Sequence, residues 1–394
     1  MVAGRFNGQN NGADSPGPAG LPRWILISIC RFRPNTSSRP VFLVAAAILF
    51  CFSSGVAFGQ APAEQADGSS PPAAVGNATK SGETAQSVAA LAEAQSLLHA
   101  GKVSEAETTT RQFLQGHADS ADGHFLLGYI LFREIQTQAR AKGTMQDSVD
   151  TSLAQFRDAH AKASLAEFTL GAKYHEPGAF DLKIVALDYV LLGDDADADK
   201  WLTHSIERNP ADSDAWYNLG RTKYTENRFE EAVHAFEECL KLAPKNVRAE
   251  DNLGLSYYGL GRADDALAAY KTAIEWQSQA AQKDPEPFID LGTLYLEQNR
   301  PKEALPYLLE ATRVAPGDAK GHEKLGKAFS QLDELPKAQS ELEKAVELAP
   351  KVASLHYMLG QVYRREGLTD KAKAEFQRTE ELNGTHSSSQ KTME

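Results

Sequence analysis

The chain has 394 residues, of which 42% are hydrophobic and 24% charged, and its formal net charge is −12. These proportions are typical of a folded globular protein, and the acidic balance excludes a general nucleic-acid binder and a protein that adheres to anionic lipid. After residue 59 the chain holds a single cysteine, Cys239, so that part can form no internal disulfide. Cys239 takes the place of alanines in similar stretches, and we interpret it as a small buried residue.

Residues 1–59 have the pattern of a secretory signal peptide with a long N-terminal region. The apolar run Val41–Phe52 follows three closely spaced arginines and precedes the small residues Ala57 and Gly59. This pattern predicts export with cleavage after Gly59. The run is short for a membrane span, and an uncleaved N-terminal anchor is the alternative. We therefore expect a periplasmic or extracellular protein that has no membrane contact once it is cleaved.

Two further segments are predicted to be disordered. Residues 60–86 consist largely of Ala, Pro, Gly, Ser and Glu, and they can bury too little apolar surface to order themselves. At the other end, Asn383-Gly384 predicts a helix stop, which leaves 385–394 as a tail.

Between these segments, one pattern of helical spacing recurs with a nearly constant period. It is clearest in Asp214–Pro244, where two apolar stripes flank a polar turn. Glycine at the eighth position recurs as Gly220, Gly254, Gly292, Gly326 and Gly360. Alanine at the twentieth position recurs as Ala232, Ala266, Ala304, Ala338 and Ala372. Several positions that keep phase through consecutive units predict stacked helical hairpins.

The pattern resembles the tetratricopeptide repeat (TPR). This resemblance implies an all-α, right-handed solenoid of about eight antiparallel hairpins. It divides residues 87–384 into units that start near 87, 121, 179, 213, 247, 285, 319 and 353. The second unit is longer than the usual repeat. Its extra residues fall near 135–160, where Val149, Leu153 and Phe156 share one helical stripe.

The resemblance also implies which side chains line the concave groove. Carried over to this chain, the groove-facing positions give a candidate partner-binding set: Tyr217, Asn218, Arg221, Tyr224, Arg248, Asn252 and Tyr258. The amides of Asn218 and Asn252 could hold the backbone of an extended peptide. A clamp for a C-terminal carboxylate is incomplete here, because Tyr217 and Asp251 stand where lysine is wanted. A further set of groove lysines is interpreted as a solvated face: Lys320, Lys324 and Lys327.

Catalytic and metal-binding motifs are weak. Residues 321–328 nearly match a phosphate-binding loop, but Ala328 replaces the hydroxyl that would hold magnesium, and the repeat places the segment in a helix. His124, His322 and His356 share the fourth position with Trp216, so we interpret them as packing residues. We expect no cofactor, no metal and no enzymatic activity.

The sequence therefore predicts a non-catalytic scaffold or adaptor in a cell envelope that binds a protein or peptide in its groove. The alternative is an envelope-structure protein that binds glycan or holds a complex together, with the groove tyrosines stacking on sugars. An enzyme that uses the 135–160 insertion is the remaining hypothesis, since this stretch holds acids and His160.

Overall fold

The computed structural model describes residues 85–141 and 151–391, and in these residues every regular element is a helix. The described part contains sixteen helices: α2 (Ala85–His99), α3 (Val103–Gly116), α4 (Ala121–Ala141), α5 (Thr151–Gly171), α6 (Ala179–Leu192), α7 (Asp195–Arg208), α8 (Ser213–Thr225), α9 (Phe229–Leu242), α10 (Val247–Gly259), α11 (Ala263–Trp276), α12 (Glu286–Glu297), α13 (Pro301–Val314), α14 (Ala319–Gln331), α15 (Leu335–Leu348), α16 (Ala353–Arg365) and α17 (Thr369–Lys391).

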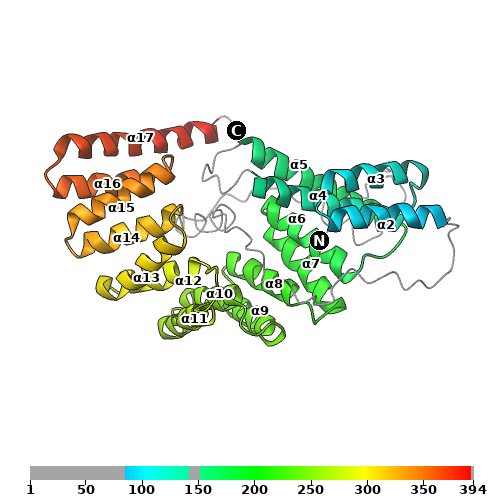
Figure 1. The fold of residues 1–394 in the computed structure, drawn as a ribbon, viewed down its shortest axis with the longest axis horizontal. Helices are drawn as coiled ribbons and strands as arrows, with labels where there is room; N and C mark the ends of the chain where they lie inside the picture. The colour runs from blue at the N-terminus through cyan, green and yellow to red at the C-terminus, as the bar shows by residue number, and fades with distance from the viewer. Residues whose placement is uncertain (1–84, 142–150, 392–394) are drawn as a thin grey trace, which may run out of the picture.

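Consecutive helices pair into eight hairpins within the described residues, and each hairpin packs mainly against the next one (Figure 1). The hairpins follow one another along a curved path from α2 to α17. In Figure 1, α10 and α12 lie on the inner side of this curve, while α9, α11 and α13 lie on its outer side. The predicted all-α, right-handed solenoid is confirmed. We call α8, α10, α12, α14 and α16 the first helices of their hairpins.

In six of the eight described hairpins a glycine lies where the two helices cross, and Ala94 and Ala186 take this position in the other two. A Cβ built on Gly220 would lie 2.7 Å from the ring of Phe236, and one built on Gly254 would lie 2.6 Å from the ring of Tyr270. Phe236 is fully buried and Tyr270 nearly so. The recurring glycine therefore lets a large side chain of the second helix lie directly on the backbone of the first, where even an alanine would clash.

The turn between the two helices also has a fixed conformation. The residue at the fifteenth position has a positive φ in seven of the hairpins: Gly101, Gly193, Asn227, Gly261, Asn299, Asp333 and Gly367. Only glycine, asparagine and aspartate occupy this position, and these residue types enter the left-handed region most easily. The polar turn of the sequence pattern is thus set by backbone geometry as well as by exposure.

The insertion near 135–160 lengthens a hairpin. Helices α4 and α5 have 21 residues each, against 12 to 15 in α2, α3 and α6–α16. The extra turns extend both helices, and Leu153 and Phe156 are half-buried on α5. Val149 and the connection 142–150 lie outside the described residues.

The predicted signal peptide 1–59 also lies outside the described residues, as does the linker up to residue 84. At the other end, α17 continues to Lys391. The helix stop predicted at Asn383-Gly384 is therefore wrong, and residues 385–391 of the predicted tail are helical. A glycine stops a helix by adopting a left-handed conformation, whereas Gly384 is itself helical.

Candidate partner-binding face

Four of the candidate groove residues lie along α8, in the unit that starts near residue 213. The Arg221 guanidinium lies 5.9 Å from the centre of the Tyr217 ring, and that ring packs at the same centroid distance against Phe236. Tyr224 packs against Phe229, at 5.5 Å between ring centres. These side chains are half-buried. Arg221 and the tyrosines are thus held by packing and present one edge to solvent, as expected for a preformed surface.

The two candidate asparagines turn their amides onto their own helices. Asn218 Nδ2 donates to the Asp214 carbonyl at 2.7 Å, and Asn252 Nδ2 donates to the Arg248 carbonyl at 2.8 Å. Both side chains are half-buried. This bond uses one N–H of each amide and leaves the second N–H and the Oδ1 for a peptide backbone. The peptide-holding role of the pair stays a prediction.

Arg248 and Tyr258 are linked to acids of the next hairpin. Arg248 Nε lies 3.2 Å from Asp284 Oδ2, and the Tyr258 hydroxyl donates to the Glu297 carboxylate. Tyr258 is nevertheless among the exposed large hydrophobic residues. These contacts connect α10 to the chain around α12, so the candidate residues of α10 belong to a wider polar network.

A cluster that the sequence analysis did not single out lies next to them. Lys320 at the start of α14 reaches back to α12, with Nζ 2.5 Å from Glu286 Oε2 and 3.4 Å from Asp290 Oδ1. The interpretation of Lys320 as a solvated lysine is wrong, because its side chain is 29% exposed and forms two ion pairs. Lys324 also forms an ion pair, with Glu323.

Asp251 completes this cluster from α10. The residue is only 4% exposed, and its Oδ1 has no hydrogen-bond partner. Burial raises its pKa well above the usual value, and the charges of Asp290, Glu286 and Asp284 raise it further. Burial also raises the pKa of Asp290 to about 6, although the Lys320 ammonium opposes this shift. We call Asp251, Asp284, Glu286 and Asp290 the acidic cluster.

Each histidine at the fourth position bonds to the second helix of its own hairpin and to the turn that precedes the hairpin. His322 Nδ1 lies 2.7 Å from Glu341 Oε2, and its Nε2 lies 3.1 Å from the Pro316 carbonyl. His124 and His356 make the same pair of contacts, and Trp216 donates its ring N–H to the Pro210 carbonyl at 3.0 Å. The three histidines are buried and bonded at both ring nitrogens, so their interpretation as packing residues is confirmed, with an added polar role.

His160, the one histidine of the 135–160 insertion, has a partner at each of its two ring nitrogens. His160 Nδ1 lies 2.9 Å from the Phe156 carbonyl, and its Nε2 lies 3.3 Å from Glu134 Oε2. Its ring also stacks on Phe156 at 3.7 Å between centres.

Cys239 on α9 is fully buried, and burial raises the pKa of its thiol to about 11. It is therefore an inert packing residue, as predicted.

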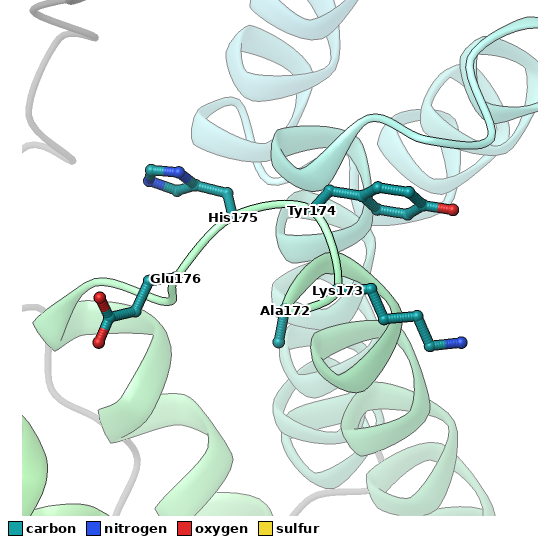
Figure 2. A pocket seen from close by; sticks show the side chains of 5 residues that line it. All are labelled: Ala172, Lys173, Tyr174, His175 and Glu176. Carbon is teal, nitrogen blue, oxygen red and sulfur yellow. The ribbon is translucent and has the colours of Figure 1, made fainter. Parts of the chain in front are cut away.

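The turn between α5 and α6 contains an open hollow lined by Ala172, Lys173, Tyr174, His175 and Glu176. Figure 2 shows His175 and Glu176 pointing to one side of this turn, and Tyr174 and Lys173 to the other. The polar groups therefore do not converge on one point.

Among residues 85–141 and 151–391, no group of three or more His, Cys, Asp or Glu could hold a metal ion. No helix of the same residues is long and apolar enough to cross a membrane.

Comparison with protein families gives three matches, all described as tetratricopeptide repeat. One covers residues 247–317, the second covers 213–246, and the third covers both 91–143 and 323–385. Together these ranges include helices from both ends of the solenoid. The matched units contain the candidate residues of α8 and α10 and the whole acidic cluster.

Individual relatives match shorter stretches. The peroxisomal targeting signal receptor of Komagataella phaffii is 28% identical over 142 residues, which are 34% of this chain and 24% of the receptor. A TPR repeat-containing protein of Methanocaldococcus jannaschii is 29% identical over 131 residues, 33% of this chain and 22% of that protein. The solved structure of YrrB, a TPR protein with an unusual peptide-binding site, is 23% identical, with a TM-score of 0.38 over 47% of this chain and 93% of that one. The chain thus spans less than a quarter of the length of these curated relatives.

Proposed function

The chain belongs to the tetratricopeptide repeat family, and we propose that it binds a protein or peptide partner on the inner side of its solenoid. The fold of this family generally serves as a non-catalytic scaffold for protein–protein interaction. We call the solvent side of the first helices α8, α10, α12, α14 and α16 the inner face.

The observation that carries this proposal is the composition of the inner face along α8 and α10. It combines tyrosines with arginines, held by ring packing and ion pairs, in neighbouring repeats. Aromatic residues and arginine are the types that dominate protein–protein binding energies, because they offer a large contact area and several hydrogen bonds. The name of the Komagataella relative, a targeting signal receptor, is consistent with recognition of a polypeptide segment.

We place this activity in a cell envelope. The support is the export pattern of residues 1–59, with a short apolar run behind arginines and small residues before the cleavage point. N-terminal sequencing of the protein from fractionated cells tests this part. A mature chain that begins at Gln60 in the soluble envelope fraction is expected, whereas an intact N-terminus in the membrane fraction would favour the uncleaved anchor.

A glycan-binding role is the second candidate, and it has one specific observation in its favour. Tyr258 and Tyr357, both on first helices, are among the exposed large hydrophobic residues. Exposed aromatic rings suit stacking on sugars as well as contact with peptides. Glycan pull-down compared with peptide-array binding separates the two functions, because a glycan binder would retain polysaccharide and ignore the peptides.

The central experiment is crosslinking capture from native envelope with the full-length chain as bait. The test variant is Asn218→Ala, Arg221→Ala, Asn252→Ala, and the control is His234→Ala, Lys271→Ala, at exposed positions of α9 and α11. The proposal expects a partner that the wild type and the control capture and the test variant loses, with helicity equal in all three. Equal capture by the test variant and the control would contradict binding through α8 and α10.

A further inference from the structure

The acidic cluster joins two hairpins at the inner face and contacts a third. Asp251 comes from α10, Asp284 precedes α12, and Glu286 and Asp290 lie on α12. Two cations meet these carboxylates, since Arg248 pairs with Asp284 and Lys320 pairs with Glu286 and Asp290. Asp318, the N-cap of α14, adds a further carboxylate near Glu286. Carboxylates therefore outnumber the cations that contact them in this part of the structure.

Asp251 is the member whose charge is least balanced. It is more than nine-tenths buried, and its Oδ1 has no hydrogen-bond partner. Asp251 lies on α10, which contacts α12, and its charge is opposed first by burial and then by the carboxylates of Asp290 and Glu286. A buried carboxyl oxygen without a partner costs about 1–3 kcal/mol, and such a group can mark strain, a functional role, or a place for a water or an ion.

A ligand that suits these carboxylates has the chemistry of an organic cation. Within the described part of the chain, no set of three or more acidic or histidine side chains has the geometry to hold a metal ion. The ammonium of Lys320 already shows which group fits, since it lies between Glu286 and Asp290 at hydrogen-bond distance. A second ammonium or guanidinium group at this place would meet carboxylates on two helices.

We propose that the acidic cluster is a specificity site for a lysine or arginine side chain of the partner polypeptide, and that Lys320 competes with this side chain for Glu286 and Asp290. The inference rests on the proposed function, which it narrows from any polypeptide to one with a basic residue. It also differs from capture of a C-terminal carboxylate, which would need cations where this chain has Asp251.

Lys320 is suited to the role of an internal competitor. Its side chain is 29% exposed and carries a flexible aliphatic stem, so the ammonium can move to solvent when another cation arrives. Glu286 and Asp290 keep 19% and 11% of their side chains exposed, so a ligand can reach them from solvent. Asp251 is only 4% exposed and its pKa is raised, and a cation bound at the cluster would favour its ionised form.

The test uses fluorescence anisotropy with the full-length chain and three labelled peptides. Each peptide is a Gly-Ser decamer with blocked ends that carries two lysines, two glutamates or two glutamines. Blocked ends remove the terminal carboxylate, so a carboxylate clamp cannot contribute. The variants are Asp251→Asn/Asp290→Asn, Lys320→Gln, and the control Glu230→Gln/Asp264→Asn, which removes the same charge at exposed positions of α9 and α11.

The inference predicts that only the lysine peptide binds measurably. Its affinity should fall at least tenfold in Asp251→Asn/Asp290→Asn, rise in Lys320→Gln, and stay unchanged in the control. Circular dichroism must show equal helicity, and the rise in Lys320→Gln cannot result from misfolding. Equal binding of the three peptides, no binding of the lysine peptide, or an equal loss in the control would overturn the inference. The proposed function would still be tested separately by the envelope capture experiment, because that experiment assumes nothing about the charge of the partner.

Discussion

Glu286 and Lys320 occupy the same position of two successive repeats, 34 residues apart, and their side chains form an ion pair with Nζ 2.5 Å from Oε2. A solenoid places equivalent positions of neighbouring units side by side. Opposite charges at one repeat position therefore attract each other across the inner face. Asp251 is at the fifth position of the preceding unit, where the next unit has Ile289, and its charge is opposed by burial and by Asp290 and Glu286 at other positions.

The first prediction concerns the stability of the acidic cluster. Asp251→Asn removes a buried charge that burial and the neighbouring carboxylates oppose. Because the pKa of Asp251 is raised in the folded state, the free energy of unfolding falls as pH rises above about 4, the unfolded value. The variant should therefore be more stable than the wild type at pH 8, by about 1–3 kcal/mol. The two should be nearly equal at pH 4.

Thermal unfolding followed by circular dichroism at both pH values measures this difference, with transition midpoints compared because long repeat arrays unfold in several steps. Glu230→Gln, an exposed acid on α9, serves as the control and should leave the midpoint unchanged. A variant that is less stable than the wild type at pH 8 would show that the Asp251 carboxylate is stabilised in the fold.

The second prediction concerns Asp188 on α6. The Ser164 hydroxyl lies 2.6 Å from Asp188 Oδ2 and 2.9 Å from the Gly128 carbonyl. A hydroxyl has one proton, so both contacts are hydrogen bonds only when Asp188 carries a proton and donates it. Burial raises the pKa of Asp188 to about 8, which agrees with this arrangement.

Between about pH 4 and pH 8 the folded state holds this proton and the unfolded chain does not, so stability falls as pH rises by up to about 1.4 kcal/mol per unit. Asp188→Asn keeps a donor for Ser164 and should flatten this slope. Urea unfolding midpoints at pH 5, 6.5 and 8 measure it. The same slope in the variant and the wild type would assign the pH dependence to other groups.

The third prediction concerns the hydrogen bonds of the histidines at the fourth position. Both ring nitrogens of His322 face acceptors, so both can donate only in the protonated ring. Burial lowers the pKa of His322, but the hydrogen bonds to Glu341 and to the Pro316 carbonyl outweigh it and leave the pKa raised. The stabilisation is therefore complete below about pH 6.5 and is lost as pH rises through the folded-state pKa.

His322→Phe copies the residue that Phe288 provides at the same position. It should cost about 1.5–3 kcal/mol at pH 5.5 and much less at pH 8.5. Urea unfolding at the two pH values measures this, and Glu341→Gln should move the midpoint in the same direction. A cost that is equal at both pH values would mean that the ring contributes only its packing.

The fourth prediction concerns the helix crossing at Gly220. The Cβ of Gly220→Ala would lie 2.7 Å from the ring of the fully buried Phe236. We expect a loss of about 1–3 kcal/mol from overpacking, although alanine favours helix formation. Gly116→Ala is the control, because nothing lies within 4 Å of that Cβ. Chemical denaturation compares them, and an equal or stabilising effect of both would show that the crossing has room for a methyl group.

Much of the fold could be predicted from the sequence, because the period of the repeat constrains it strongly. Gly220 and its equivalents kept phase and indicated the hairpin crossings. The insertion was predicted to be helical, but periodicity cannot say whether such turns extend α4 and α5 or form a separate helix. The stop at Asn383-Gly384 was wrong because a local signal ends a helix only when the backbone adopts the left-handed turn.

The inner face was less predictable. Repeat positions indicated that Asn218 and Asn252 face the groove, but no sequence pattern shows that their amides bond to their own helices. The acidic cluster was not predicted, because each of its four residues taken alone looks like an ordinary exposed acid. The signal was present in the charges at groove positions of successive units, where Glu286 and Asp290 precede Lys320 by about one repeat.

The most direct test of partner binding on the inner face is site-specific photo-crosslinking in the native envelope. A photoreactive phenylalanine replaces either Tyr258 or Tyr357 on first helices, or Leu242 or Leu309 on α9 and α13. Exposure is matched within each pair, at 43% and 42% for Tyr258 and Leu242, and at 50% and 49% for Tyr357 and Leu309. We predict one partner adduct at the tyrosine positions that is absent from both leucine positions. Adducts of equal yield at all four positions, or at the leucine positions alone, would contradict an inner-face binding surface.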